Sequence, residues 1–278
     1  MLLPLALACA LLAPAASKVE SKFEQVAPAP GGGEPARTPG RARAVVLLHG
    51  YRLHLRDGSV SRPEFRPWQR PGSALVKELA ADADVFAFAY GQNACLSDVV
   101  ERSRLAADVA LLRKLGYREV VLVGHSAGGL VARQFVEDHP AAGVTKVVQI
   151  CSPNGGCFSA TLTVPHSQEA FVRCLTVKGR EQCLKERAAV RVPEGVQFVC
   201  FVGQGAGNVG GDGVVSCRCQ WTADLQKQGI PALALTVGHR EAVRSPKCAR
   251  ALAELVRKEQ PRWRPERVQK ARKEILGK

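Results

Sequence analysis

The sequence lacks any apolar stretch long enough to cross a membrane. Its N-terminal stretch, Leu2 to Ala16, is an uncharged run rich in leucine, alanine and proline. It is shorter than the roughly 20 residues that a transmembrane helix needs, and it ends in small residues. Because Ala13-Pro14-Ala15 fits a signal-peptidase site, residues 1–16 are predicted to be the signal peptide of a secreted or periplasmic protein. Cleavage before Cys9, as in a lipoprotein, would leave almost no apolar region, so simple export is favoured over lipid anchoring.

Zinc-type pairs of cysteine and histidine are also missing. Cys217 and Cys219 form a Cys-x-Cys motif with no second pair at zinc-like spacing, so no metal site and no cofactor are expected. Ten cysteines are nevertheless many for a chain of 278 residues. In an oxidising compartment their expected use is in disulfides. If Cys9 leaves with the signal peptide, an odd number remains, and at least one thiol has no partner within the chain.

Acidic residues are scarce, with 25 Asp and Glu against 39 Lys and Arg, which gives a net charge of +14. Part of the excess lies in a basic tail, residues 259–278, for which a solvated amphipathic helix is the favoured interpretation. Binding of this tail to an anionic membrane surface stays the alternative. No nucleic acid is expected as a partner, because no recognition motif accompanies the charge. The oligomeric state stays open.

The order of apolar and polar segments predicts one α/β domain. Residues 17–43 are rich in proline and glycine and are predicted to be a disordered linker. Beyond them, short apolar runs indicate buried strands at 44–48, 85–90, 120–123, 144–150, 196–202 and 232–237. Helices are expected between them at 73–83, 98–115, 128–138, 222–228 and 242–258. Such alternation is typical of a doubly wound, mainly parallel sheet, here over residues 44–258.

Residues 152–195 interrupt this alternation. The segment contains Cys157, Cys174 and Cys183, has mixed polarity and is too long for a simple connection. We expect it to be a cap insertion pinned by disulfides over the carboxyl edge of the sheet. Its apolar side chains either line an acyl groove or form a small core of their own; they are Phe158, Leu162, Val164, Phe171, Val172 and Leu175.

A nucleophile is predicted at Ser126. Gly124-His125-Ser126-Ala127-Gly128 has the form G-x-S-x-G, preceded by an apolar strand and followed by an apolar helix. In this setting a sharp strand-to-helix turn presents the serine hydroxyl, and glycines are needed because a Cβ would clash in so tight a bend. The oxyanion of an acyl-transfer reaction also needs N–H donors. We assign this role to the backbone N–H groups of Ala127 and Tyr51. Tyr51 directly follows His49-Gly50, the turn after the first strand of the domain.

The general base is predicted to be His239, because it closely follows the last expected strand and so lies at the carboxyl edge with Ser126. The orienting acid should come between the two in the chain. Asp212, in a glycine-rich loop, is preferred. Asp224 is the competitor but belongs to an expected helix, where an exposed position would explain it, and Glu194 precedes its strand at the wrong edge of the sheet.

Together these motifs resemble the lipase/esterase branch of the α/β-hydrolase superfamily over residues 44–258. The order of the segments is the strand before His49-Gly50, the elbow at Ser126, Ser152-Pro153-Asn154-Gly155-Gly156, Gly211-Asp212-Gly213, and His239. The third segment is similar to the T-P-H-x-G turn of bacterial lipases, with asparagine in place of histidine. The resemblance implies hydrolysis of carboxylic esters through an acyl-enzyme, without a cofactor, and strengthens Asp212 as the acid.

The same residues leave other functions open. A thioesterase or acyltransferase would use the same triad, and a cap that excludes water would favour transfer. A non-catalytic cationic binding protein on a hydrolase fold is the alternative from another class. The substrate class among esters and lipids also stays open at this point.

Overall fold

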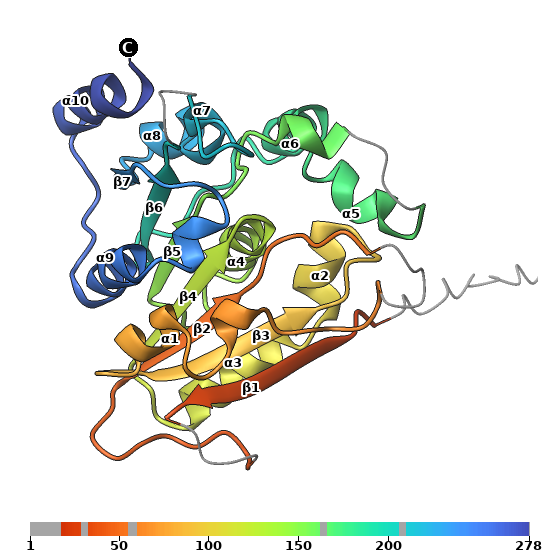
Figure 1. Ribbon diagram of the computed structural model, residues 1–278, viewed down its shortest axis with the longest axis vertical. Helices are drawn as coiled ribbons and strands as arrows, with labels where there is room; N and C mark the ends of the chain where they lie inside the picture. The colour runs from red at the N-terminus through yellow and green to blue at the C-terminus, as the bar shows by residue number, and fades with distance from the viewer. Residues whose placement is uncertain (1–17, 29–32, 55–59, 162–165, 206–209, 278) are drawn as a thin grey trace, which may run out of the picture.

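A computed structural model describes residues 18–28, 33–54, 60–161, 166–205 and 210–277. Its centre is a seven-stranded sheet in the order β1-β3-β2-β4-β5-β6-β7. All neighbouring strands run parallel except β1, which pairs antiparallel with β3 at one edge. Figure 1 shows β1, in red, and β7 at opposite edges of this sheet. The predicted doubly wound, mainly parallel sheet is therefore confirmed.

The parallel strands coincide with the apolar runs of the sequence. Their bounds are β2 (Arg43–Leu48), β3 (Asp84–Tyr90), β4 (Glu119–His125), β5 (Lys146–Ile150), β6 (Gln197–Gly203) and β7 (Ala232–Leu235). Strands covered on both faces need apolar side chains on both, which explains why β3 is buried at every position. The weaker burial of β7 fits its place at the edge of the sheet.

Helices cover both faces of the sheet. One face packs against α1 (Ala74–Leu79) and α9 (Pro246–Arg257), which contact each other. The other face packs against α2 (Leu96–Arg102), α3 (Leu105–Lys114) and α4 (Ala127–Asp138). Helices α7 (Cys217–Gln220) and α8 (Ala223–Lys227) extend that second layer toward β7. The carboxyl ends of the strands thus lie between two helical layers, where loops are free to carry a site.

The predicted linker at 17–43 is wrong for part of its length. Residues Ser21–Ala27 form β1, which pairs with β3 from Ser21 opposite Tyr90 to Ala27 opposite Val85. The strand exposes polar side chains on one face, while Phe23 stacks on Phe86 with ring centres 5.2 Å apart. A half-exposed antiparallel edge strand lacks the continuous apolar run of the buried strands, so composition masks it.

The single helix predicted over 98–115 is also wrong, because the chain breaks at Ser103. This residue adopts an extended backbone (φ −85°, ψ 178°) between α2 and α3. The break lets the Arg104 N–H donate to the hydroxyl of Ser21 at 3.0 Å, which ties β1 to the helical layer. Both helices keep their apolar side chains in the core.

The cap contains α5 (Glu169–Arg173), α6 (Val177–Glu186) and two short 3-10 turns, η3 (Phe158–Thr161) and η4 (His166–Gln168). The disulfide pin predicted for it is not supported, because all nine described cysteines are free thiols. Hydrogen bonds hold the cap instead. The Cys157 thiol donates to the carbonyl of Val214 at 3.1 Å, and the Cys157 N–H donates to Leu175 at 2.8 Å.

Apolar packing adds to these bonds. Phe171, Val172 and Leu175 are buried, and the rings of Tyr51 and Tyr90 both lie against Phe171. These three cap residues therefore form part of the core, whereas Phe158 is 81% exposed. Leu162 and Val164 lie outside the described residues, as does the predicted signal peptide at 1–16.

The basic tail forms α10 (Pro265–Leu276), shown in blue beside β7 in Figure 1. Its apolar side chains Val268, Ala271 and Ile275 are buried, while most of its charged side chains are exposed. This is the amphipathic helix expected from the sequence. Among the described helices, none is both long and apolar enough to cross a membrane.

One buried carboxyl group should make stability depend on pH. Asp108 on α3 is 1% exposed, its Oδ2 has no partner within the described structure, and Oδ1 binds Arg104 at 3.1 Å. Burial outweighs the arginine and raises the pKa of Asp108 to about 6. An unfolded aspartate has a pKa of about 3.9, so the folded state loses stability as pH rises from about 4 to 6.

Asp108→Asn should remove this loss. Relative to the wild type, the variant should gain about 1.4 kcal/mol of unfolding free energy between pH 5 and pH 7.5, because about one pKa unit of the wild-type loss falls in that range. Urea unfolding at the two pH values measures it. An equal difference between variant and wild type at both pH values would show that Asp108 is ionised in the folded protein at pH 5.

Candidate active site

Ser126 lies in a strained turn between β4 and α4. Its backbone has φ 54° and ψ −125°, a region that non-glycine residues rarely adopt. The turn is possible because its neighbours are glycines. A Cβ on Gly124 would lie 2.5 Å from the backbone of Gly128, and one on Gly128 would lie 2.4 Å from the carbonyl oxygen of Leu48. The sequence motif therefore forms the sharp elbow that was predicted for it, with Ser126 at the N-terminus of a helix.

His239 and Asp212 are hydrogen-bonded, although they are far apart in the sequence. The Nδ1 atom of His239 lies 2.7 Å from Oδ2 of Asp212, and the His239 N–H donates to the Asp212 carbonyl at 2.9 Å. The other carboxylate oxygen, Oδ1, accepts the N–H groups of Val214 at 2.8 Å and Val215 at 2.7 Å. Both oxygens of Asp212 thus have fixed partners, which sets the plane of the imidazole ring.

These bonds keep Asp212 ionised. Burial alone would raise the pKa of this carboxyl, but the bond from His239 and the two N–H groups lower it below its ordinary value. A carboxylate at this position favours the tautomer of His239 that carries its proton on Nδ1. The Nε2 atom is then the nitrogen that can accept a proton.

Two further histidines hold the site together as neutral rings. The Nε2 atom of His125 lies 2.9 Å from the carbonyl oxygen of His239, so the residue before Ser126 is tied to the candidate base. His49 lies between Gly50, whose carbonyl is 2.8 Å from Nδ1, and Tyr90, whose N–H donates to Nε2 at 3.3 Å. Burial lowers the pKa of both rings to about 3. His49 is therefore a structural hydrogen-bonding residue, as expected.

The first turn of the domain lies directly against the serine. A Cβ on Gly50 would lie 2.7 Å from Cβ and 3.2 Å from Oγ of Ser126, so only glycine fits there. Tyr51 follows in this turn, and Ala127 begins α4. First-turn N–H groups of a helix have no partner within the helix and so can bind an anion. The turn that carries Tyr51 thus lies against Ser126, and Ala127 directly follows Ser126; the oxyanion role of their N–H groups stays a prediction.

The competing acid Asp224 has another partner, and it is not simply exposed as expected. Its Oδ2 lies 2.5 Å from Arg133 of α4. Burial alone would raise the pKa of Asp224, but the ion pair with Arg133 outweighs burial and lowers it. Arg133 also binds the side chain of Asn154 at 3.2 Å. Glu194 is exposed in the loop before β6.

The Ser152–Gly156 turn has a structural role. Asn154 is buried and donates to Gln149 at 2.7 Å and to the carbonyl of Gln220 at 2.8 Å. The asparagine that replaces the histidine of the lipase turn therefore binds β5 to α7. These buried hydrogen bonds explain why a polar side chain, Asn154, stands where the similar turn of bacterial lipases has histidine.

Sequence reasoning missed one residue beside the triad. Cys151 directly follows β5, is fully buried, and has a left-handed backbone with φ 51°. Its Sγ, one oxygen of Asp212 and one ring nitrogen of His239 lie within 4.8 Å of one another. No motif marks this cysteine, because only the neighbouring positions of β5 and β6 bring it to Asp212.

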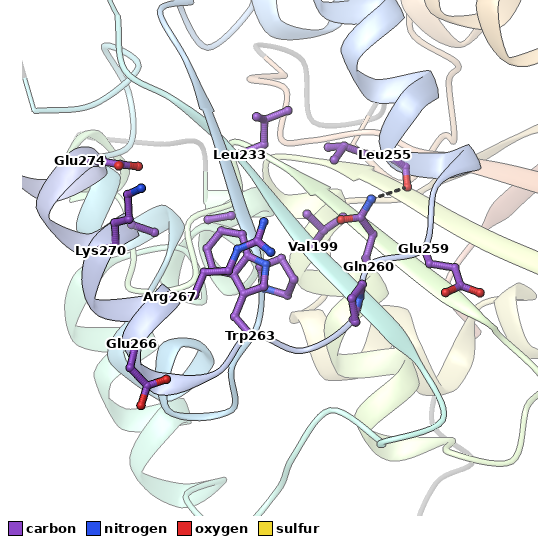
Figure 2. A pocket seen from close by; sticks show the side chains of 14 residues that line it. Val199, Leu233, Leu255, Glu259, Gln260, Trp263, Glu266, Arg267, Lys270 and Glu274 are labelled. Atoms are coloured by element: carbon purple, nitrogen blue, oxygen red, sulfur yellow. Dashed lines mark hydrogen bonds between the residues drawn. The ribbon is translucent and has the colours of Figure 1, made fainter.

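A large cavity lies elsewhere. It has a volume of about 930 Å³ and is lined by residues of β7, α9, α10 and the segment between these helices, among them Leu233, Leu255 and Trp263. Figure 2 shows Arg267 over the Trp263 ring, with its guanidinium carbon 4.6 Å from the ring centre. The described residues that line this cavity include no member of the candidate triad.

Comparison with known proteins agrees with this geometry. The sequence model of the alpha/beta hydrolase family matches residues 45–266 of this chain. Among solved structures, lipase BlEst2 of Bacillus licheniformis is similar in its propeptide form, with a TM-score of 0.64, 15% identity and coverage of 87% of this chain. This chain spans only 54% of that structure. The mature form of the same lipase is similar with a TM-score of 0.58 and 15% identity, and the match covers 85% of this chain and 96% of that one.

Phospholipase PlaB of Legionella pneumophila is similar as well, with a TM-score of 0.59, 13% identity, and coverage of 85% of this chain and 63% of that one. No curated protein sequence matches the chain. At these identities the likeness to solved structures concerns the fold alone. The family match extends over most of the chain and includes Ser126, Asp212 and His239, and so the protein belongs to the alpha/beta hydrolase family.

Proposed function

We propose that this protein is an exported serine hydrolase that cleaves carboxylic esters through an acyl-enzyme on Ser126. The observation that supports this most is the 2.7 Å bond between Asp212 and His239, which is tied through His125 to the strained serine. The nucleophile Ser126, the orienting acid Asp212 and the base His239 follow one another in the chain order that this fold uses. The export that the N-terminal sequence predicts is part of the proposal.

The reaction follows from the positions of these groups. His239 accepts the Ser126 proton at Nε2, and the serine oxygen attacks the ester carbonyl. The N–H groups of Ala127 and Tyr51 stabilise the oxyanion. The protonated imidazole, whose charge Asp212 stabilises, then gives its proton to the leaving alcohol. Water repeats the same steps on the acyl-enzyme and releases the acid.

Transfer of the acyl group to an alcohol, or cleavage of a thioester, would use the same residues. Product analysis with added alcohols distinguishes transfer from hydrolysis. A cationic binding protein without catalysis would not need a strained serine backbone, which costs roughly 1–3 kcal/mol. This cost favours an enzyme.

An apolar patch beside the triad supports an apolar substrate. Phe158, Val177 and Val214 are 81%, 36% and 42% exposed and come from three segments. The Cys157 thiol binds the Val214 carbonyl at 3.1 Å, and a Cβ on Gly156 would lie 2.4 Å from Cα of Val177, so the three segments meet. Val214 is also hydrogen-bonded to Asp212. Large apolar side chains exposed together commonly mark a binding surface.

A series of p-nitrophenyl esters, from short to long acyl chains and with and without detergent micelles, tests this function. We expect activity on the long esters, and Phe158→Ser should lower kcat/KM for them at least about tenfold, because about 1.5–3 kcal/mol of apolar burial is lost. Short soluble esters should change less than about twofold.

Ala188→Ser is the matched control, because Ala188 is an exposed residue after α6 outside the patch. It should leave both rates unchanged. Highest activity on short soluble esters would identify an esterase rather than a lipase. No ester turnover at any chain length would contradict the proposed function itself.

A further inference from the structure

The triad contains a metal-ligand set that its catalytic role does not use. Cys151 Sγ, Asp212 and His239 offer a sulfur, an oxygen and a nitrogen within 4.8 Å of one another. Zinc binds these three ligand types with bonds of about 2.0–2.3 Å in a tetrahedron, so its ligand atoms lie about 3.5 Å apart. The nitrogen and oxygen, 2.7 Å apart, are closer than this and must open slightly, while the sulfur lies within 4.8 Å of both, so small shifts bring all three atoms to one ion.

The backbone directs the thiol to this place. Cys151 and Ser126 are the two non-glycine residues with positive φ in the described part of the chain. A Cβ on Gly203 would lie 3.0 Å from the Cys151 sulfur and 2.8 Å from Cβ of Asp212, so thiol and carboxylate occupy adjacent space above β6. Strained backbone concentrates at functional sites.

We propose that Cys151, Asp212 and His239 form an inhibitory binding site for zinc and similar thiophilic divalent cations. The ion takes the place of the proton between Nδ1 and Oδ2, which must separate from 2.7 Å to about 3.4 Å. Access is from the side of His239, whose side chain is 12% exposed, whereas that of Asp212 is fully buried.

Charge and protons balance in this step. Cys151 enters this step as a thiol, because a fully buried sulfur beside the Asp212 carboxylate disfavours a second negative charge. Binding forms a zinc–sulfur bond and releases the thiol proton to solvent. Thiolate and carboxylate together then neutralise the two charges of the ion. Val214 and Val215 hold Oδ1 of Asp212 and leave Oδ2 as the oxygen ligand.

Inhibition follows from the tautomer of His239. With the ion on Nδ1, the ring proton moves to Nε2. That nitrogen then carries a hydrogen and cannot accept the proton of Ser126. This consequence rests on the proposed function, whereas binding of the ion does not. Zinc bound only at Nε2 would also inhibit, but it would not involve Cys151.

Two measurements test the site on the full chain. In the first, Zn²⁺ is titrated into an ester-hydrolysis assay and then removed with EDTA. We expect reversible inhibition of the wild type, and Cys151→Ala should raise the inhibition constant at least about 100-fold, because a ligand is lost. Cys151→Ser, which keeps the shape of the side chain, should also bind more weakly. Cys200→Ala should stay within about threefold of the wild type, because Cys200 is a buried thiol on the other face of the sheet from Cys151.

The second measurement follows binding without turnover. Co²⁺ is added to Ser126→Ala, and thiolate-to-cobalt absorption is recorded in the near ultraviolet. The band should appear with one ion per chain and be lost in Ser126→Ala carrying Cys151→Ala. If that band is absent, or if Cys151→Ala keeps the wild-type zinc inhibition, the site does not exist. If ester hydrolysis fails but the cobalt band appears, the proposed function is wrong and the metal site stands.

Discussion

Replacing Ser126 by alanine is expected to lower kcat for ester hydrolysis by roughly 10³–10⁶ and to leave the fold intact. The hydroxyl is the only group lost, and the elbow keeps its glycine contacts with Leu48 and with Gly128. Turnover of p-nitrophenyl esters by purified wild type and variant measures the effect.

Covalent labelling provides the control for this variant. A fluorophosphonate should label the wild type at one site and leave Ser126→Ala unlabelled. Thermal melting of the two proteins should agree, which excludes misfolding as the cause. A variant with near-wild-type turnover would show that another nucleophile does the chemistry.

Asp212→Asn is expected to lower kcat by about 10⁴. Because Oδ1 accepts the N–H groups of Val214 and Val215, the asparagine oxygen should stay there and the amide NH₂ should face His239. Nδ1 must then accept a hydrogen bond, which places the ring proton on Nε2. The base is held in the wrong tautomer and cannot activate Ser126. Steady-state kinetics near neutral pH measures the loss.

Asp224→Asn distinguishes this effect from general loss of a buried carboxylate. Asp224 is bound to Arg133, so its replacement should lower the melting temperature and leave kcat within about threefold. If Asp224→Asn lost the larger part of kcat and Asp212→Asn kept it, the orienting acid would be Asp224.

The parallel strands could be predicted because burial on both faces demands uninterrupted apolar residues. Val120 to Val123 is such a run and lies within β4. The edge strand β1 could not be predicted in this way, since its segment is half exposed and precedes a stretch rich in proline and glycine. The break at Ser103 likewise depends on a tertiary contact, the bond between Arg104 and Ser21.

The candidate site divides in the same manner. Ser126, Asp212 and His239 were predicted because each follows a strand whose carboxyl end lies at one edge of the sheet. The disulfides were predicted from the number of cysteines, which says nothing of the distances between them. Cys151 was missed because its position depends on strand order, and Arg133 was missed as the partner of Asp224 for the same reason.

The contact of Gly128 with the Leu48 carbonyl also affects how the protein can diverge. Elbow and first turn meet backbone to backbone, so a side chain at Gly50, Gly124 or Gly128 has no room. Substitutions of these glycines should therefore be tolerated very rarely. The cap and the loop of Val214 meet through side chains and single hydrogen bonds, which tolerate replacement. New substrate preferences should therefore arise by changes in the cap while the chemistry at Ser126 is inherited unchanged.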